Sequence, residues 1–90
     1  PDRAITRLEI AVQAVRALGK ESEASQYAAQ GDQFIDAAEW SASEWQRNFI
    51  GASAALGIIG GYPDGSFRPA RNATRAEAVV MIHRALAARQ

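Results

Sequence analysis

The chain has 90 residues, and its ten Lys and Arg are matched by ten Asp and Glu, so the formal net charge is zero. This length predicts a single domain over residues 1–90, and the balanced charge argues against a general nucleic-acid or anionic-membrane binder. The chain has no cysteine and one histidine, which excludes disulfides, thiolate metal sites, cysteine nucleophiles and a multi-histidine metal site. We expect no metal and no cofactor, and no apolar run approaches the roughly 20 residues of a membrane span.

The first predicted helix covers residues 6–18, and its sequence recurs near the end of the chain. Its apolar residues follow helical spacing, and Gly19 is suited to end it. Residues 6–18 and 74–86 share seven of 13 positions, namely Thr, Arg, Glu, Val, Arg, Ala and Leu. This match indicates a repeat. We therefore interpret residues 1–18 as the closing helix of a preceding repeat and residues 34–88 as one complete repeat, about one and a half repeats in all.

The middle of the chain is predicted to hold two more helices. A short helix is expected over residues 22–30, followed by a connector that buries Phe34. The pattern Ser41-x-x-Glu44 has the spacing of a capping box and predicts a helix over residues 43–56. The inner face of that helix would carry Trp45, Phe49, Ala52 and Leu56.

The last third of the chain is predicted to combine a buried extended piece, a turn and a helix. Ile58 and Ile59 form a pair too short for a helix and are expected to run extended into the core. Tyr62-Pro-Asp-Gly-Ser66 has the residues of a tight turn, and the final helix is expected over residues 74–88. The fold class is therefore mainly α, with short extended segments and a Gly-rich turn.

Both repeat helices begin with Thr-Arg-x-Glu, and two residues of this motif have a structural explanation. A threonine at the N-cap accepts a hydrogen bond from the third helical amide, and a glutamate there bonds back to the cap. We therefore predict that Thr6, Glu9, Thr74 and Glu77 are capping residues.

The arginine of this motif suggests binding. Arg7 and Arg75 occupy the first helical position, where unpaired N–H groups and partial positive charge already disfavour a cation. Two such arginines concentrate donors and positive potential, which is typical of an anion-binding site. For each arginine a role without ligand binding stays open, in which the side chain pairs with a neighbouring carboxylate or points into solvent.

The glycine-rich turn and the tryptophans are further candidates. Gly61 and Tyr62 could bring backbone amides and an aromatic face to a ligand, or could serve only the turn. Trp45 could stack on a sugar ring or pack in the core. No catalytic residue is predicted, since one histidine gives no Ser–His–Asp arrangement and the spacing of the carboxylates supports no glycosidase pair. We therefore expect the chain not to be an enzyme.

Several of these motifs together resemble the S-layer homology (SLH) domain family. The resemblance rests on Phe34-x-Asp36, on Trp45-x4-Ile50, on Leu56-Gly-Ile-Ile-Gly-Gly-Tyr-Pro-Asp-Gly-Ser-Phe-Arg-Pro69 and on Thr74-Arg-Ala-Glu77. It spans residues 34–86 as one whole repeat and residues 1–18 as the tail of another. The chain departs from the family pattern at Leu8 and Ala73, and residues 19–33 look like an insert.

The resemblance implies an anchoring function. SLH modules hold bacterial surface proteins non-covalently to the cell envelope by binding secondary cell-wall polysaccharides, often pyruvylated ones. It therefore implies an extracellular, cell-surface location and a bacterial cell-wall polysaccharide as partner. The ligand contacts implied are Arg75 and Arg7, with Gly61, Tyr62 and Trp45 as weaker ones. The alternative is a structural module that self-associates or packs with further SLH repeats and binds no glycan.

Overall fold

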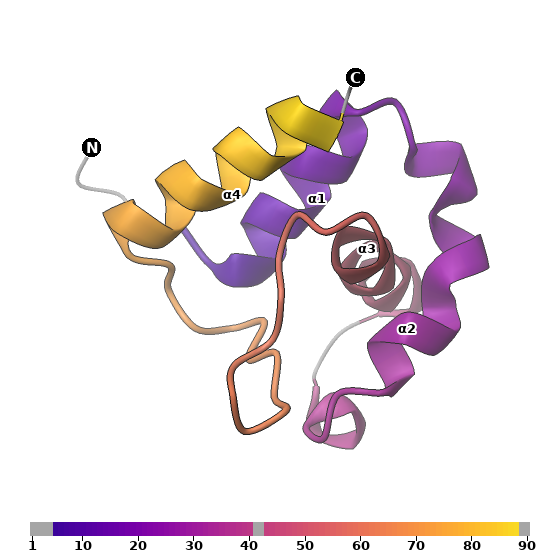
Figure 1. The fold of residues 1–90 in the computed structure, drawn as a ribbon. Coiled ribbons are helices and arrows are strands. Elements are labelled where there is room, and N and C mark those ends of the chain that lie inside the picture. The colour runs from indigo at the N-terminus through magenta and orange to yellow at the C-terminus, as the bar shows by residue number, and fades with distance from the viewer. Residues whose placement is uncertain (1–4, 41–42, 89–90) are drawn as a thin grey trace.

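A computed structural model describes residues 5–40 and 43–88 and shows a mainly α fold, as predicted (Figure 1). It has four α-helices and two 3-10 helices in the described ranges: α1 (Arg7–Ala17), η1 (Glu21–Tyr27), α2 (Ala28–Asp32), η2 (Ala37–Glu39), α3 (Glu44–Ala55) and α4 (Arg75–Ala88). Those ranges contain no strand, and an isolated antiparallel bridge joins Thr6 to Asn72. The predicted helix over residues 22–30 is replaced by η1 followed by α2.

Helices α1 and α3 form the centre of the fold. Helix α4 packs on one side of α1 and α3 packs on another, while η1 and α2 pack on α3 (Figure 1). The bridge between Thr6 and Asn72 aligns the chain entering α1 with the chain entering α4. In addition, the N–H groups of Arg7 and Leu8 donate to the carbonyls of Arg71 and Pro69 at 2.9 and 3.0 Å. The start of α1 is therefore tied to the segment before α4.

Both Thr-Arg-x-Glu helices start with reciprocal capping bonds. At α1, the Glu9 N–H donates to Thr6 Oγ1 at 3.1 Å and the Thr6 N–H donates to Glu9 Oε1 at 2.9 Å. At α4, Glu77 and Thr74 exchange the same pair of bonds at 3.0 and 2.9 Å. These bonds satisfy N–H groups that a helix start leaves without intrahelical partners.

Helix α3 begins with a different capping arrangement from the one the sequence predicted. Ser43 is its N-cap, and the Ser43 N–H donates to Gln46 Oε1 at 2.9 Å. The predicted first member, Ser41, lies outside the described residues. Glu44 is the first helical residue instead of the third.

The core contains the predicted isoleucine pair, and it contains Trp40 instead of Trp45. Ile58 and Ile59 are fully buried, as predicted, but they lie in a bend after α3, where both N–H groups donate to the Ser53 carbonyl, and not in an extended segment. Trp45 was expected on the inner face of α3, but it is 49% exposed, whereas Trp40 is 8% exposed and belongs to the main core cluster. The reason is that η2 folds back so that the Trp40 ring packs 6.0 Å from the Phe67 ring.

A close crossing of α2 and α3 depends on two glycines. A Cβ on Gly51 would lie 2.0 Å from the carbonyl oxygen of Tyr27, and a Cβ on Gly31 would lie 3.2 Å from that of Arg47. Neither position has room for a side chain without moving backbone. The segment that the sequence suggested as an insert is therefore packed tightly against α3.

The glycine-rich turn is held by carboxylates. Tyr62 N–H donates to the Ser66 carbonyl at 2.8 Å, and Gly65 has a φ of +89°, which favours glycine. Asp64 accepts from the N–H and hydroxyl of Ser66 at 2.9 and 2.7 Å. Asp36 accepts from the N–H groups of Phe67 and Arg68 at 2.9 and 2.8 Å, which fixes the chain after the turn.

Candidate functional site

A hollow of about 270 Å³ lies where the glycine-rich turn meets α4 and the start of α1. It brings together residues far apart in the sequence, because α1 opens the chain and the turn follows more than 50 residues later. The predicted site residues Arg7, Gly61, Tyr62 and Glu77 line it, together with Ile59, Gly60, Pro63, Val80, Met81 and Arg84. We call it the turn hollow.

Arg7 forms the inner wall of the turn hollow and is 3% exposed. Its Nε donates to the Phe67 carbonyl at 2.8 Å and its Nη2 to the Gly60 carbonyl at 2.7 Å. Its Nη1 pairs with Glu77 Oε2 at 3.0 Å. Three of the five N–H donors of the guanidinium are thus used inside the protein. Arg7 therefore holds the turn against the start of α4.

Tyr62 lies at the centre of a cluster of arginines. The guanidinium carbons of Arg7, Arg68 and Arg71 lie 4.4, 4.8 and 5.2 Å from its ring centroid. Each distance is within the range of a cation–π contact. Arg68 is also paired with Asp64 at 2.8 Å. The faces of Tyr62 are consequently occupied by cations of the protein itself.

The turn hollow carries more positive than negative charge. Arg7 and Arg84 line it, and Arg68 and Arg71 contact the ring of Tyr62, which also lines it. The carboxylates that these arginines contact are Glu77 and Asp64, which pair with Arg7 and Arg68. Arg71 and Arg84 are exposed and form no ion pair within residues 5–40 and 43–88. A chain of zero net charge therefore has a locally positive surface here.

The carboxylates beside the turn hollow are held in the charged form. Hydrogen bonding to the backbone of Thr74 lowers the pKa of Glu77, with further lowering from the Thr74 hydroxyl and the charges of Arg7 and Arg71. Bonds from the Ser66 hydroxyl and N–H lower the pKa of Asp64 to about 2, and Arg68 adds to this. Burial raises the pKa of Asp36, but hydrogen bonds from the backbone N–H groups of Phe67 and Arg68 outweigh it and the net change is downward.

Arg75 has very different surroundings from Arg7. It is the first residue of α4, and its side chain is exposed. Within the described part of the chain it makes no hydrogen bond and no ion pair. It does not line the turn hollow. The two arginines of the repeated motif are thus not equivalent in this structure.

Gly61 is required by packing. A Cβ at this position would lie 2.6 Å from the Phe34 ring and 2.8 Å from the Ser66 carbonyl oxygen. The lack of a side chain lets the turn approach Phe34 closely. This contact explains the glycine whether or not a ligand is present.

Trp45 lies apart from the turn hollow. It sits in the first turn of α3, with its ring 5.7 Å from that of Phe49 and the guanidinium of Arg16 6.0 Å away. The structure therefore groups Arg7, Gly61, Tyr62 and Glu77 and leaves Trp45 and Arg75 elsewhere.

Sequence reasoning missed three arginines that line the turn hollow or contact the Tyr62 ring beside it. Arg68, Arg71 and Arg84 were not singled out, although all three follow the turn or lie on the last helix. Arg71 has a sequence signal, because it occupies the same place in the repeat as Arg3. Arg84 is also one of the identical positions, since it aligns with Arg16, but its place beside the turn depends on the packing of the turn against α4.

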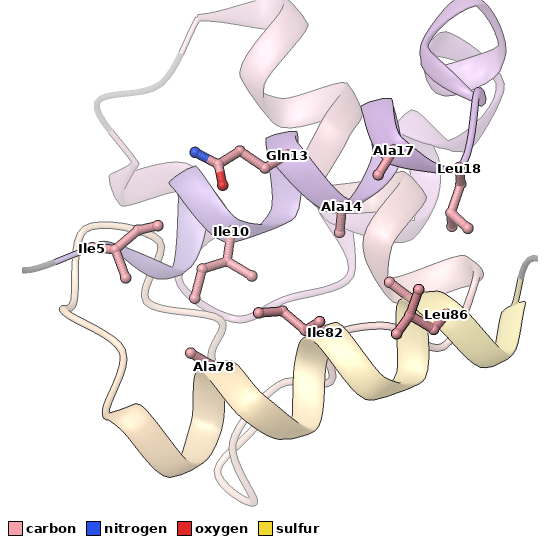
Figure 2. A pocket seen from close by; sticks show the side chains of 10 residues that line it. Ile5, Ile10, Gln13, Ala14, Ala17, Leu18, Ala78, Ile82 and Leu86 are labelled. Atoms are coloured by element: carbon pink, nitrogen blue, oxygen red, sulfur yellow. The ribbon is translucent and has the colours of Figure 1, made fainter. Parts of the chain in front are cut away.

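A second, apolar groove of about 260 Å³ runs between α1 and α4. Figure 2 shows Ile10 of α1 and Ile82 of α4 pointing toward each other across it, with Leu18 and Leu86 at one end. Ile82 and Leu86 are 56% and 53% exposed. This groove is a hydrophobic surface that the described residues leave uncovered.

Neither a metal site nor a membrane helix is found in the residues that the structure describes. No group of three or more His, Asp or Glu side chains there could hold a metal ion. None of the helices described is long and apolar enough to cross a membrane.

Comparisons with known proteins point to one family. Residues 40–79 match the S-layer homology domain family. The chain is 38% identical over 85 residues to the middle cell wall protein of Brevibacillus brevis, covering 94% of this chain and 8% of that protein. It is 36% identical over 86 residues to the cellulosome-anchoring protein of Acetivibrio thermocellus, covering 96% of this chain and 18% of that protein.

Some relatives are enzymes. The chain is 37% identical over 83 residues to the amylopullulanase of Thermoanaerobacterium thermosulfurigenes, covering 92% of this chain and 4% of the enzyme. The chain therefore spans less than a fifth of the length of each of these relatives. No solved structure matches the chain.

Proposed function

The chain belongs to the S-layer homology family, and on this premise we propose that it anchors a bacterial surface protein by binding an acidic secondary cell-wall polysaccharide. Its relatives include cell-wall, surface-layer and cellulosome-anchoring proteins, so the chain is an extracellular module of the cell surface. The anchoring is non-covalent and involves no catalysis. The ligand is a glycan with acidic groups, of which a pyruvylated amino sugar is one form.

The positive surface around the turn hollow carries this proposal. Arg71 and Arg84 are exposed and have no ion-pair partner in the described ranges, so they can bond to a carboxylate without breaking an ion pair of the protein. A guanidinium binds a carboxylate through two parallel N–H bonds, which suits the acid of a pyruvyl ketal. The hollow of about 270 Å³ gives one sugar residue a place beside Tyr62 and Gly61.

The proposed roles of the two motif arginines differ. Arg7 forms the wall of the site and adds its charge to the positive surface, while its hydrogen bonds hold the turn in place. Arg75 is a second contact for acidic groups, because it is exposed at a helix start where positive potential is already present. The capping residues support binding indirectly, because their hydrogen bonds fix the helix starts on which these arginines lie. They are Thr6, Glu9, Thr74 and Glu77.

The use of the carboxylates supports a role without catalysis. Asp36 and Asp64 accept hydrogen bonds that hold the chain on both sides of the turn, and their pKa values are lowered. A general acid in a glycosidase needs a raised pKa so that it carries a proton at neutral pH. Incubation of the chain with wall polysaccharide should therefore release no sugar.

The test is retention on purified cell-wall sacculi. We expect the double variant Arg71→Gln/Arg84→Gln to lose retention about tenfold or more, since each charge-assisted bond contributes roughly 1.5–3 kcal/mol. Arg75→Ala should weaken retention further, and all three changes should leave the helical circular-dichroism signal intact. Lys20→Gln is the matched control, because Lys20 is paired with Glu23 at 3.5 Å away from the hollow.

Chemical removal of pyruvyl groups from the sacculi separates the acidic ligand from the rest of the wall. Retention of the unchanged chain should fall to the level of the double variant. Equal retention of the double variant and the unchanged chain on untreated sacculi would contradict the proposal.

Self-association is a second candidate function, and the groove between α1 and α4 favours it. This groove is apolar, and Val79, Val80, Ile82 and Leu86 of α4 are each about half exposed or more. A second copy of the chain could cover this surface. Light scattering of the purified chain tests this, with Ile82→Glu as the disrupting variant. A stable oligomer that ignores sacculi would favour self-association over glycan binding.

A further inference from the structure

We infer a second sugar-binding site around Trp45, which takes a neutral sugar residue. It rests on the proposed glycan function but uses a different surface and a different ligand chemistry from the turn hollow. The observation behind it is an exposed tryptophan with a hollow on each side. One hollow of about 260 Å³ is lined by Trp45 with Phe49, Asn48, Ser22 and Ser25. Another of about 190 Å³ is lined by Trp45 with Gln13 and Gln46.

The indole ring at this site is fixed and accessible. Trp45 is 49% exposed, and the Phe49 ring meets it edge-on at 5.7 Å with an angle of 90° between the planes. Phe49 is buried, so the contact anchors Trp45 to the second core cluster. Arg16 lies 6.0 Å from the ring centroid, at the outer limit of a cation–π contact, and borders the indole. Apolar C–H groups of a sugar can therefore pack on the exposed part of the ring.

The polar groups around Trp45 fit sugar hydroxyls. The larger hollow offers the Asn48 amide and the hydroxyls of Ser22 and Ser25, and the smaller one offers the amides of Gln13 and Gln46. An apolar platform with a few convergent amides and hydroxyls is the usual composition of a site for a small polar ligand. The segment residues 19–33, which has no counterpart in the other part of the repeat, supplies the two serines.

The charges at this site favour a neutral ligand over an acidic one. Arg16 is paired with Glu21 at 3.5 Å and both side chains line the larger hollow, while Glu9 lines the smaller hollow together with Arg16. An acidic sugar would meet the Glu21 carboxylate as well as the guanidinium. A neutral residue such as an N-acetylhexosamine meets no such repulsion. The turn hollow, by contrast, has an excess of arginines.

The two sites lie on opposite sides of α1. Arg7 at the turn hollow and Arg16 at the Trp45 site are nine residues apart on one helix. At 3.6 residues per turn, this separation is about two and a half turns, so the side chains point in opposite directions and are offset by about 13 Å along the axis. The two sites would therefore bind different residues of a wall polymer.

The test uses a neutral tetrasaccharide of N-acetylglucosamine as the probe and the fluorescence of Trp45 as one readout. Trp40 is buried, so acrylamide should quench mainly Trp45. We expect the probe to reduce this quenching and to shift the amide NMR signals of Ser22, Ser25 and Asn48. Trp45→Ala should weaken binding about tenfold, and Trp45→Phe should weaken it less because a smaller ring remains. If Trp45→Ala does not fold, Asn48→Ala replaces it as the test. We expect Asn48→Ala to bind the probe about threefold more weakly than the unchanged chain.

One double variant keeps this proposal separate from the proposed function. The double variant Arg71→Gln/Arg84→Gln should bind the neutral probe as well as the unchanged chain does, although it loses retention on sacculi. Unchanged quenching at millimolar probe, or NMR shifts confined to Gly60–Pro63, would overturn the Trp45 site. The sacculi experiment would still stand in that case, because it depends on the turn hollow.

Discussion

The two Thr-Arg-x-Glu helices share a sequence motif and a capping arrangement but place their arginines in opposite environments. Arg7 is buried and bonded to two carbonyls and a carboxylate, whereas Arg75 is exposed and has no such partners in the described residues. The motif therefore specifies where the helix starts, and the chain packed against that start specifies what the arginine does. At α1 that chain is the glycine-rich turn.

This difference means that a motif arginine can act in two ways. Arg7 joins the turn to the helix starts and so shapes the hollow in which we propose that a sugar binds. Arg75 offers its whole guanidinium to solvent. Variants of the residues around the two arginines should separate these roles by their effects on stability.

The largest expected effect is that of Arg7→Ala on folding. The change leaves the Gly60 and Phe67 carbonyls without a donor and Glu77 without its ion pair. We expect a loss of about 3 kcal/mol in the free energy of unfolding, out of roughly 5–13 kcal/mol for a domain of this size. Urea titration followed by circular dichroism measures it. Arg7→Lys should recover little of this stability, because a lysine cannot reproduce the three directed bonds. A loss below 1 kcal/mol for Arg7→Ala would contradict the structural role that separates Arg7 from Arg75.

A smaller effect is expected from Tyr62→Ala, which takes away the ring that Arg7, Arg68 and Arg71 share. We expect a loss of about 2 kcal/mol, since a desolvated cation–π contact is worth up to that amount. Tyr62→Phe is the matched control and should lose less than about 0.5 kcal/mol, because the Tyr62 hydroxyl lies 3.5 Å from Glu77, a long distance for a hydrogen bond. Equal losses in the two variants would show that the hydroxyl matters and the ring does not.

The pH dependence of stability tests the Glu77 side of the Arg7 contact. The pKa of Glu77 is lowered in the folded protein, mainly by hydrogen bonding to Thr74 and also by Arg7. Its contribution is therefore complete above the ordinary pKa of 4.5 and is lost as the pH falls through the lowered value. Glu77→Gln should cost about 1 kcal/mol at pH 7, and this cost should shrink toward acid pH. Glu44→Gln, at an exposed helix start, is the control and should show a smaller cost at pH 7. The same dependence of stability on pH in both variants would contradict the stabilising role of the Glu77 carboxylate.

The local features of the fold could be predicted from the sequence, but the surroundings of Arg7 could not. Helix spacing, cap residues and the turn signature predicted α1, α4, the buried Ile58–Ile59 pair and the turn, because each depends on residues close in sequence. The bonds of Arg7 to Gly60 and Phe67 span more than 50 residues and leave no local pattern.

The burial of Trp40 in place of Trp45 has the same cause. Helical spacing placed Trp45 on the inner face of α3, and no sequence pattern placed Trp40 in the core. The position of Trp40 is decided by Asp36, which fixes the backbone of Phe67 and Arg68 beside it across about 30 residues. Only tertiary packing brings these rings together.

The smallest expected effect on stability, and the sharpest test of the comparison, is that of Arg75→Ala. Its side chain is exposed and has no hydrogen-bond or ion-pair partner in the described ranges, so the free energy of unfolding should change by less than about 0.5 kcal/mol. Removing a cation from a helix start could even stabilise α4 by a few tenths of a kcal/mol. Retention on acidic sacculi should nevertheless fall, because the guanidinium is then missing from the surface. A destabilisation as large as that of Arg7→Ala would mean that Arg75 has an internal partner, and unchanged retention would mean that it does not touch the glycan.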